Sequence, residues 1–273
     1  MSRRVKRKRA SVTGGPQGPF LREVLLMEER IPDPNAYPYN LPVVRQLSAW
    51  RLHPRVTFLI GENGSGKSTL LEAIAVAWGF NAEGGSKNFA FQTTDKITSG
   101  LHNALRLHRG IPRPWDGFFL RAESFFNLAT KIDELDEEPA ISSRIKDAYG
   151  GKSLHDQSHG ESFLALFLNR FKGDALYILD EPEAALSPMR QMAFLTRLHS
   201  LVQENSQFVI ATHSPILLAY PDAEIFQIAQ DGRLELVDYK ETAHYRVTRD
   251  FLNKPEAMLK ILLATDGPDT DDE

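Results

Sequence analysis

The first group of residues that could do chemistry is the run GENGSGKST at residues 61–69. It fits the pattern G-x-x-x-x-G-K-[ST] in full, between a short apolar run and a stretch with helical periodicity. Glycines let the backbone curl so that successive N–H groups point at phosphate oxygens, and a helix beginning there adds its positive dipole end. The pattern predicts a phosphate-binding loop made of Gly61, Glu62, Asn63, Gly64, Ser65, Gly66, Lys67, Ser68 and Thr69.

Two side chains of this loop have predicted roles toward a nucleoside triphosphate. Lys67 is expected to reach the β- and γ-phosphates, and the Ser68 hydroxyl is expected to bind Mg²⁺. The alternative is a glycine-rich turn between a strand and a helix with an exposed lysine. The full match and its context favour the phosphate loop.

Two carboxylates end a second apolar run, LYILDEPEAALS. Ligands of open parallel sheets bind outside the carboxyl ends of the strands, where the phosphate loop also lies. Asp180 is therefore expected to hold Mg²⁺ directly or through water, and Glu181 to orient or deprotonate a water that attacks the γ-phosphate. The alternative for Glu181 is an anion at a helix start, ahead of Pro182.

A histidine follows a third apolar run, FVIATHSP. His213 is expected to project into the same crevice as Asp180, where it could hydrogen-bond the γ-phosphate or the attacking water. Ser214 and Pro215 form a good N-cap and first-turn pair for the next helix. A single histidine at a strand end is more often structural, but its position relative to the two other motifs favours a functional role.

Strands and helices in alternation must position these residues. Apolar runs at residues 55–60, 175–180 and 207–212 each precede a helical stretch, which predicts an α/β fold with a mostly parallel sheet flanked by helices. An antiparallel β element is expected at the N-terminus, and Asp231-Gly232 signals a hairpin. Two helices are expected to close the chain. Residues 95–172 are the best candidate for an inserted helical subdomain.

Composition limits the class of protein. With 273 residues, 42% hydrophobic, the chain can build one large domain, expected over residues 19–264. It has no cysteine, which excludes disulfides and thiolate metal sites, and no apolar stretch of membrane-spanning length, so a cytoplasmic protein without membrane insertion is expected. A basic arm (1–18) and an acidic tail (265–273) are expected to be disordered. The arm could contact nucleic acid or be a solvated tail.

The three motifs, in this order, resemble those of ABC-type ATPases, specifically small soluble ATPases related to the heads of structural-maintenance-of-chromosomes and recombination-repair proteins. The resemblance spans residues 42–228. GENGSGKST resembles Walker A, LYILDEPEAALS resembles Walker B running into the D-loop, and ATHSP resembles the H-loop. It implies a P-loop NTPase fold, ATP and Mg²⁺ as ligands, and hydrolysis of ATP to ADP and phosphate.

A fourth motif lies about twenty residues before Walker B, where that family keeps its Leu-Ser-Gly-Gly-Gln signature. The resemblance implies a homodimer on ATP binding, head to tail, in which this signature caps the γ-phosphate held by the partner. The chain departs from the pattern, and Ser187 stands where the D-loop usually has aspartate. Taken alone, the stretch also fits a capping box. The signature positions are Ser158, His159, Gly160 and Glu161.

Two further roles have alternatives. Where the family has its Q-loop glutamine, Glu123 is proposed as a metal or water ligand, with Gln92 as a rival and a plain surface residue as a third reading. Tyr37 or Tyr39 is placed to stack on adenine, although aromatic residues beside prolines are more often simple packing.

Three functions follow from these patterns. The first is an ATP-driven dimerising switch in a nucleic-acid-related process, such as repair, mobile-element control or phage defence. The second is the nucleotide-binding subunit of a membrane transporter, which the departures in the Q-loop, signature and D-loop disfavour. The third is a nucleotide-sensing adaptor for an effector protein encoded nearby, which the presence of Glu181 and His213 disfavours.

Overall fold

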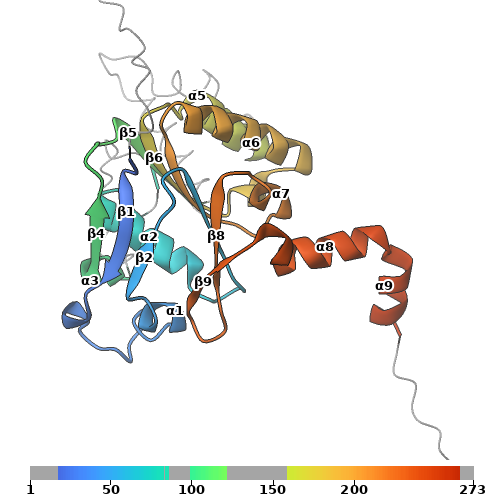
Figure 1. The fold of residues 1–273 in the computed structure, drawn as a ribbon, viewed down its shortest axis with the longest axis horizontal. Coiled ribbons are helices and arrows are strands. Elements are labelled where there is room, and N and C mark those ends of the chain that lie inside the picture. Colours follow the sequence, from blue (N-terminus) through green and yellow to red (C-terminus); the bar gives the residue numbers. More distant parts are fainter. Residues whose placement is uncertain (1–17, 83, 86–98, 122–158, 265–273) are drawn as a thin grey trace, which may run out of the picture.

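The computed structural model describes residues 18–82, 84–85, 99–121 and 159–264, and Figure 1 shows their arrangement. In this part of the chain the larger sheet has the strand order β5-β6-β7-β3-β8-β9. All neighbours are parallel except β8 and β9, which form the expected hairpin. The strands are β3 (Val56–Ile60), β5 (Asp116–Arg121), β6 (Ala175–Asp180), β7 (Gln207–Ala211), β8 (Ala223–Ile228) and β9 (Leu234–Val237).

A smaller antiparallel sheet confirms the predicted N-terminal β element. Its central strand is β1 (Leu21–Leu26), which pairs with β2 (Ala49–Arg51) and β4 (Leu105–Arg109). Gln207 of β7 joins the two sheets, because its buried amide accepts from the Leu21 N–H and donates to the Leu21 carbonyl, each at 2.8 Å. The same amide nitrogen donates to the His53 carbonyl at 3.0 Å.

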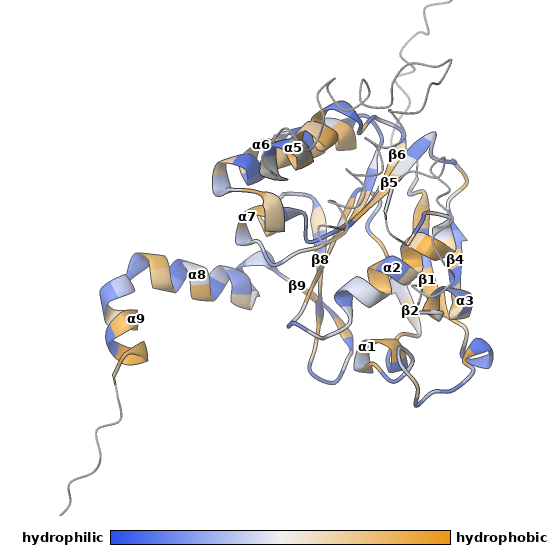
Figure 2. Cartoon of the chain, turned by 180° about the vertical axis from the view of Figure 1, so that it is seen from behind, coloured by the Kyte–Doolittle hydropathy of each residue, from blue (hydrophilic) through white to orange (hydrophobic). Residues whose placement is uncertain are grey.

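Helices cover both faces of the larger sheet (Figures 1 and 2). Successive residues of β3 alternate between the two cores: Phe58 packs on one face and Leu59 on the other. Because both faces are buried, these strands are continuous apolar runs, as the sequence predicted. The Phe58 face carries α5 (His159–Asn169), α6 (Pro188–Gln203) and α7 (Pro215–Leu218). The Leu59 face carries α1 (Pro42–Arg45), α2 (Lys67–Trp78) and α3 (Leu101–Ala104).

The remaining described elements are short turns, the two C-terminal helices and those within residues 95–172. Short 3₁₀ turns lie at Glu28–Arg30, Pro182–Ala185 and Tyr239–Glu241. The helices α8 (Ala243–Asn253) and α9 (Pro255–Leu262) confirm the two expected C-terminal helices and extend away from the sheets (Figure 1). Within residues 95–172, β4 and β5 belong to the two sheets and α5 follows, while residues 122–158 lie outside the described part, as do most of the two tails.

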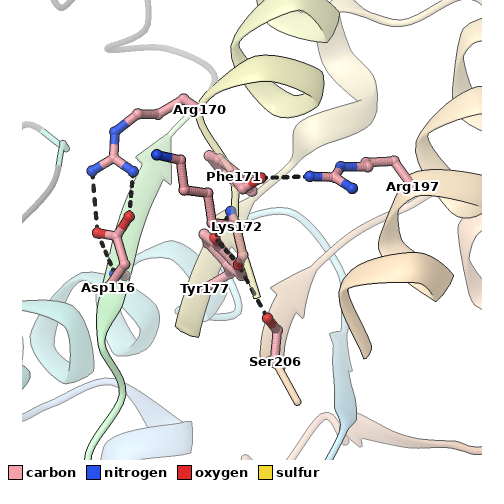
Figure 3. Close-up of polar contacts among 8 residues, drawn as sticks. Asp116, Arg170, Phe171, Lys172, Tyr177, Arg197 and Ser206 are labelled. Atoms are coloured by element: carbon pink, nitrogen blue, oxygen red, sulfur yellow. Dashed lines mark hydrogen bonds and ion pairs between the residues drawn. The ribbon is translucent and has the colours of Figure 1, made fainter. Parts of the chain in front are cut away.

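A group of polar contacts fixes the connection between α5 and β6 (Figure 3). The buried Tyr177 hydroxyl accepts from the Lys172 N–H at 2.6 Å and donates to the Lys172 carbonyl at 2.7 Å. Burial raises the pKa of Tyr177, so the hydroxyl keeps the proton that it donates. Arg197 donates to the Phe171 carbonyl at 2.7 Å, and Ser206 donates to the Lys172 carbonyl at 3.3 Å. These contacts hold α5 and α6 against the strand that carries Asp180.

Asp116, at the start of β5, is expected to make folding stability depend on pH. Burial raises its pKa, but hydrogen bonds and charge from Arg170 outweigh burial, so the pKa lies below the ordinary 3.8. A depressed carboxyl pKa stabilises the fold above the unfolded value, and this contribution is lost as the pH falls through the folded value. Asp116→Asn should lower the unfolding free energy by about 1–3 kcal/mol at pH 7, and the difference from wild type should shrink toward pH 3.

Urea unfolding at pH 7 and pH 3 measures this difference. The exposed pair of Arg233 and Asp231, 2.6 Å apart, supplies the control, since solvent screens such pairs. Asp231→Asn should change stability far less than Asp116→Asn. Equal losses of unfolding free energy in the two variants would show that burial of the Asp116 carboxylate is not the source of its stabilising effect.

Candidate functional site

Residues 61–66 form a tight loop between β3 and α2, and residues 67–69 are the first turn of α2. Gly66 has the left-handed φ of 96°, and a Cβ there would lie 2.8 Å from Cγ1 of Val43. A larger residue would therefore be strained and would also clash with α1. Gly64 has a φ of 80°, so the loop turns with backbone that favours glycine.

Lys67 is buried and folded back over this loop. Its Nζ donates to the Gly61 carbonyl at 2.8 Å and to the Glu62 carbonyl at 3.0 Å. Burial lowers the pKa of Lys67, against the opposing charges of Glu181, Asp180 and Glu183. A buried ammonium of this kind gains strongly from a bound anion, because the anion restores the charge balance that burial disfavours.

Ser68 and Asp180 meet where α2 begins and β6 ends. The Ser68 hydroxyl donates to Oδ1 of Asp180 at 3.1 Å, and the Asp180 carboxylate is nearly fully buried. One hydroxyl and one carboxylate are hard oxygen ligands of the kind that Mg²⁺ takes, together with water and substrate phosphates. The two residues therefore fit the predicted Mg²⁺ site and would hold the ion.

Arg121 is a residue at this site that the sequence reasoning missed. It ends β5 directly beside the end of β6, and its Nε lies 3.7 Å from Oδ2 of Asp180. Its Nη1 also donates to Glu72 of α2 at 3.2 Å. Burial raises the pKa of Glu72, and the Arg121 charge opposes this rise. The guanidinium thus balances the charge of the metal-site carboxylate. The sequence did contain a signal for Arg121, because this arginine ends a strand-like run just as Asp180 does.

Glu181 and His213 come together as predicted. His213 Nε2 lies 3.4 Å from Oε1 of Glu181, at the ends of two neighbouring strands. Glu181 adopts a left-handed conformation with φ of 50°, which turns the chain sharply after Asp180. Both side chains are partly exposed, 41% for Glu181 and 32% for His213, although Nε2 of His213 is itself buried.

Two further groups hold His213 in place, and the sequence reasoning missed both. The Glu183 carboxylate accepts from the His213 backbone N–H at 2.5 Å. Burial raises the pKa of Glu183, while this hydrogen bond lowers it. His213 Nδ1 lies 3.1 Å from Nε2 of His244, in the first turn of α8. Glu183 was visible as the third acid of DEPE, but no sequence spacing links His244 to His213. Ser214 caps α7 as expected.

The two tyrosines proposed for adenine have different environments. Tyr37 is 64% exposed, and its hydroxyl lies 3.1 Å from the Thr69 hydroxyl at the end of the phosphate loop. Tyr39 is buried, and its hydroxyl donates to the Gly100 carbonyl at 3.2 Å. Only Tyr37 of this pair presents a ring face next to the loop.

The signature and Q-loop predictions fall mainly on residues that the structure does not describe. Ser158, Glu123 and Gln92 lie outside the described residues. His159 and Gly160 lie in α5 as far as the structure describes it, directly after the undescribed residues. In this helix, Glu161 pairs with Nη2 of Arg190 in α6 at 3.0 Å. At the D-loop position, the Ser187 hydroxyl caps α6 by accepting from the Arg190 N–H.

A cavity of about 470 Å³ opens on the outer side of the phosphate loop. Its walls come from residues 61–65 of the loop, residues 227–230 at the end of β8, and the start of α8. His244 is one of the lining side chains. Among the described helices, none has both the length and the apolar character that crossing a membrane requires.

The chain matches the protein-family model described as "AAA domain, putative AbiEii toxin, Type IV TA system" over residues 56–106 and 154–219. The match contains the phosphate loop, the acidic strand end and His213. Its second segment begins at residue 154, just ahead of the signature positions.

Sequence relatives include "ABC transporter G family member STR2" of Medicago truncatula, 23% identical over 77% of this chain and 30% of the relative. "Probable ATP-dependent transporter ycf16" of Antithamnion sp. is 24% identical over 72% of this chain and 86% of the relative. This chain therefore spans less than a third of the first relative.

Similar solved structures include a putative metal-chelate type ABC transporter, with 14% identity, a TM-score of 0.47, and coverage of 84% of this chain and 88% of the other. The SMC head domain from Thermotoga maritima has 16% identity, a TM-score of 0.40, and coverage of 80% and 99%.

Proposed function

We propose that this chain is an ABC-type P-loop ATPase, which binds ATP with Mg²⁺ and hydrolyses it to ADP and phosphate. The observation that supports this most directly is the 3.1 Å contact between the Ser68 hydroxyl and Asp180. It joins the Walker A helix to the Walker B strand, next to Glu181. A metal-binding pair and a candidate base therefore adjoin one phosphate loop.

Each group has a distinct part in the proposed reaction. The loop N–H groups and Lys67 would bind the phosphates, and Ser68 and Asp180 would hold Mg²⁺, which would neutralise phosphate charge. Glu181 takes a proton from the attacking water as the water oxygen bonds to the γ-phosphorus. The bond from that phosphorus to the bridging oxygen breaks, and ADP leaves. His213 directs Nε2 to the same place and orients the water or the γ-phosphate.

We further propose that ATP closes a head-to-tail homodimer. The signature positions His159, Gly160 and Glu161 lie in α5, and the N-terminal dipole end of this helix would suit a phosphate held by a second copy. Ser158 would offer a hydroxyl there, and Gly160 would allow close backbone approach. Binding would close the dimer, and hydrolysis through Glu181 would open it.

The proposed process is nucleic-acid-related, such as repair, mobile-element control or phage defence. The description of the matching family model names a putative toxin of a toxin–antitoxin system, and we take this as support for a nucleic-acid-related role. The names of the sequence relatives favour a second candidate, the nucleotide-binding subunit of a transporter. Co-purification from detergent-solubilised membranes distinguishes the two, because a transporter subunit should come down with a membrane permease.

Phosphate release with and without Mg²⁺ tests the hydrolysis itself. Steady-state turnover that needs Mg²⁺ supports an ATPase. An adaptor that only senses nucleotide, the third function considered from the sequence, should bind ATP with turnover near the background of the assay.

Tyr37 is expected to support the adenine ring. Tyr37→Ala should weaken ATP binding by about 1–3 kcal/mol, which is about 5- to 160-fold in Kd, because stacking of a base on an aromatic ring contributes that much. Titration with a fluorescent ATP analogue measures the change. Tyr37→Phe keeps the ring and loses only the contact with Thr69, so its Kd should stay within a few-fold of wild type. If Tyr37→Phe weakens ATP binding as much as Tyr37→Ala does, the hydroxyl and not the ring is responsible for the loss of affinity.

A further inference from the structure

The imidazole rings of His213 and His244 form a contact that connects α8 to the site. His213 Nδ1 and His244 Nε2 lie 3.1 Å apart, and the two ring centroids are 5.3 Å apart. Thr242 fixes the start of α8, since its hydroxyl accepts from the Tyr245 N–H at 3.2 Å. Its own side chain is fully buried. His244 therefore projects from an anchored helix start.

Each ring also has a second nitrogen, which takes no part in the contact between the two histidines. His213 Nε2 is buried without a hydrogen-bond partner in the described part of the chain, and it faces Oε1 of Glu181 at 3.4 Å. Nδ1 of His244 is likewise buried without such a partner there. The only polar contact of His244 that the described residues supply is therefore the one with His213.

Hydrogen-bond chemistry restricts where the protons lie. If His244 donates from Nε2, Nδ1 of His213 accepts, and neutral His213 carries its proton on Nε2. If His244 accepts instead, His213 donates from Nδ1. A neutral His213 would then face the Glu181 carboxylate with a lone pair, which is repulsive, so donation from His244 is the favoured arrangement. Donation from His244 to Nδ1 keeps the proton of the neutral His213 ring on Nε2, directed at Glu181.

We propose that His244 is a positioning residue, which holds the His213 ring with Nε2–H directed at the Glu181 side of the site. This inference rests on the proposed ATP hydrolysis. His244 acts through His213 and aligns the group that orients the water or the γ-phosphate. It thereby makes α8 part of the catalytic machinery, although α8 follows the last sheet strand by several residues.

The surroundings of His244 agree with this role. Burial lowers its pKa, with smaller contributions from His213 and Lys67, so the neutral ring that can donate or accept is favoured. The charged groups near the pair are Lys67, Glu181 and Glu183. His244 also lines the cavity beside the phosphate loop, so the contact lies at the edge of the site.

Three substitutions in the full chain test the proposal. His244→Leu removes the hydrogen bond and should lower kcat about 10–100-fold with KM for ATP changed less than about threefold. His244→Gln, whose amide also donates and accepts, should restore most of kcat. Val247→Ala, on an exposed part of the same helix, should leave both parameters unchanged. Thermal unfolding of each variant reports any loss of fold.

A double-mutant cycle with His213→Ala gives the decisive outcome. If His244 works through His213, adding His244→Leu to His213→Ala should cost nothing further in single-turnover phosphate release. Equal, additive losses in both backgrounds would overturn the inference, as would a failure of His244→Gln to rescue a folded protein. If the wild-type chain shows no ATP hydrolysis that depends on Lys67, the proposed function and this inference both fail. If the wild-type chain hydrolyses ATP but the His244 variants behave otherwise than expected, this inference fails alone.

Discussion

Lys67→Ala should reduce ATP hydrolysis at least about 100-fold, the typical loss when one preorganised donor to developing charge is removed. The reason lies in the local geometry. The ammonium is buried and held by two loop carbonyls, 2.8 and 3.0 Å away, so it sits preorganised at the loop that binds phosphate. Phosphate release and titration with a fluorescent ATP analogue measure the loss of turnover and of binding.

The fold of the Lys67→Ala variant should survive. Burial already disfavours the charged lysine, so removing it relieves a desolvation cost while two hydrogen bonds are lost. Lys240→Ala, at an exposed lysine far along the chain, is the matched control and should behave as wild type. Hydrolysis that persists in a folded Lys67→Ala variant would contradict the assignment of the phosphate loop as the catalytic site.

Glu181→Gln should retain ATP binding, lose hydrolysis by about 100-fold or more, and accumulate an ATP-bound dimer. The amide has nearly the size of the carboxyl group but cannot take the proton of the attacking water. It can still accept a hydrogen bond from Nε2 of His213, which lies 3.4 Å from the wild-type carboxylate. Light scattering should then show about twice the 30.8 kDa of the chain when ATP and Mg²⁺ are present.

A second substitution identifies the surface through which this dimer forms. Ser158→Arg added to Glu181→Gln should return the mass to that of one chain while ATP stays bound, because the bulky cation blocks approach at the signature. A monomer in Glu181→Gln itself would contradict the dimer switch but leave the ATPase assignment intact. Unchanged hydrolysis in that variant would instead contradict the role of Glu181.

The sequence predicted the sheet that carries these groups because of a simple physical relation. Parallel strands covered on both faces must be apolar along their whole length, so β3, β6 and β7 were visible as uninterrupted runs. The chemically capable residues follow each run directly, at strand ends that share one sheet edge. The structure brings Ser68 into contact with Asp180, and Glu181 into contact with His213.

Other parts of the site depend on contacts between distant segments, which local patterns do not encode. Arg121 reaches Asp180 through the register of β5 and β6, and His244 reaches His213 through the path of the chain after β9. Helical periodicity predicted α8 and α9. It could not show that their apolar side chains, such as Leu252 at 70% exposure, would extend away from the sheets. The signature and the Q-loop stay predictions at residues outside the described part.

The amide of Gln207 has a consequence for which nucleotides this site can distinguish. It ties β7, which leads to His213, to β1 and to the segment before β3. Tyr37, which we propose to stack on adenine, lies in the segment between β1 and β2, so both proposed ends of the nucleotide site are attached to strands that Gln207 joins. The distance between these two ends is therefore set by the fold before any ligand binds. We expect the length of the phosphate chain, more than the identity of the base, to decide whether the His213 end is engaged.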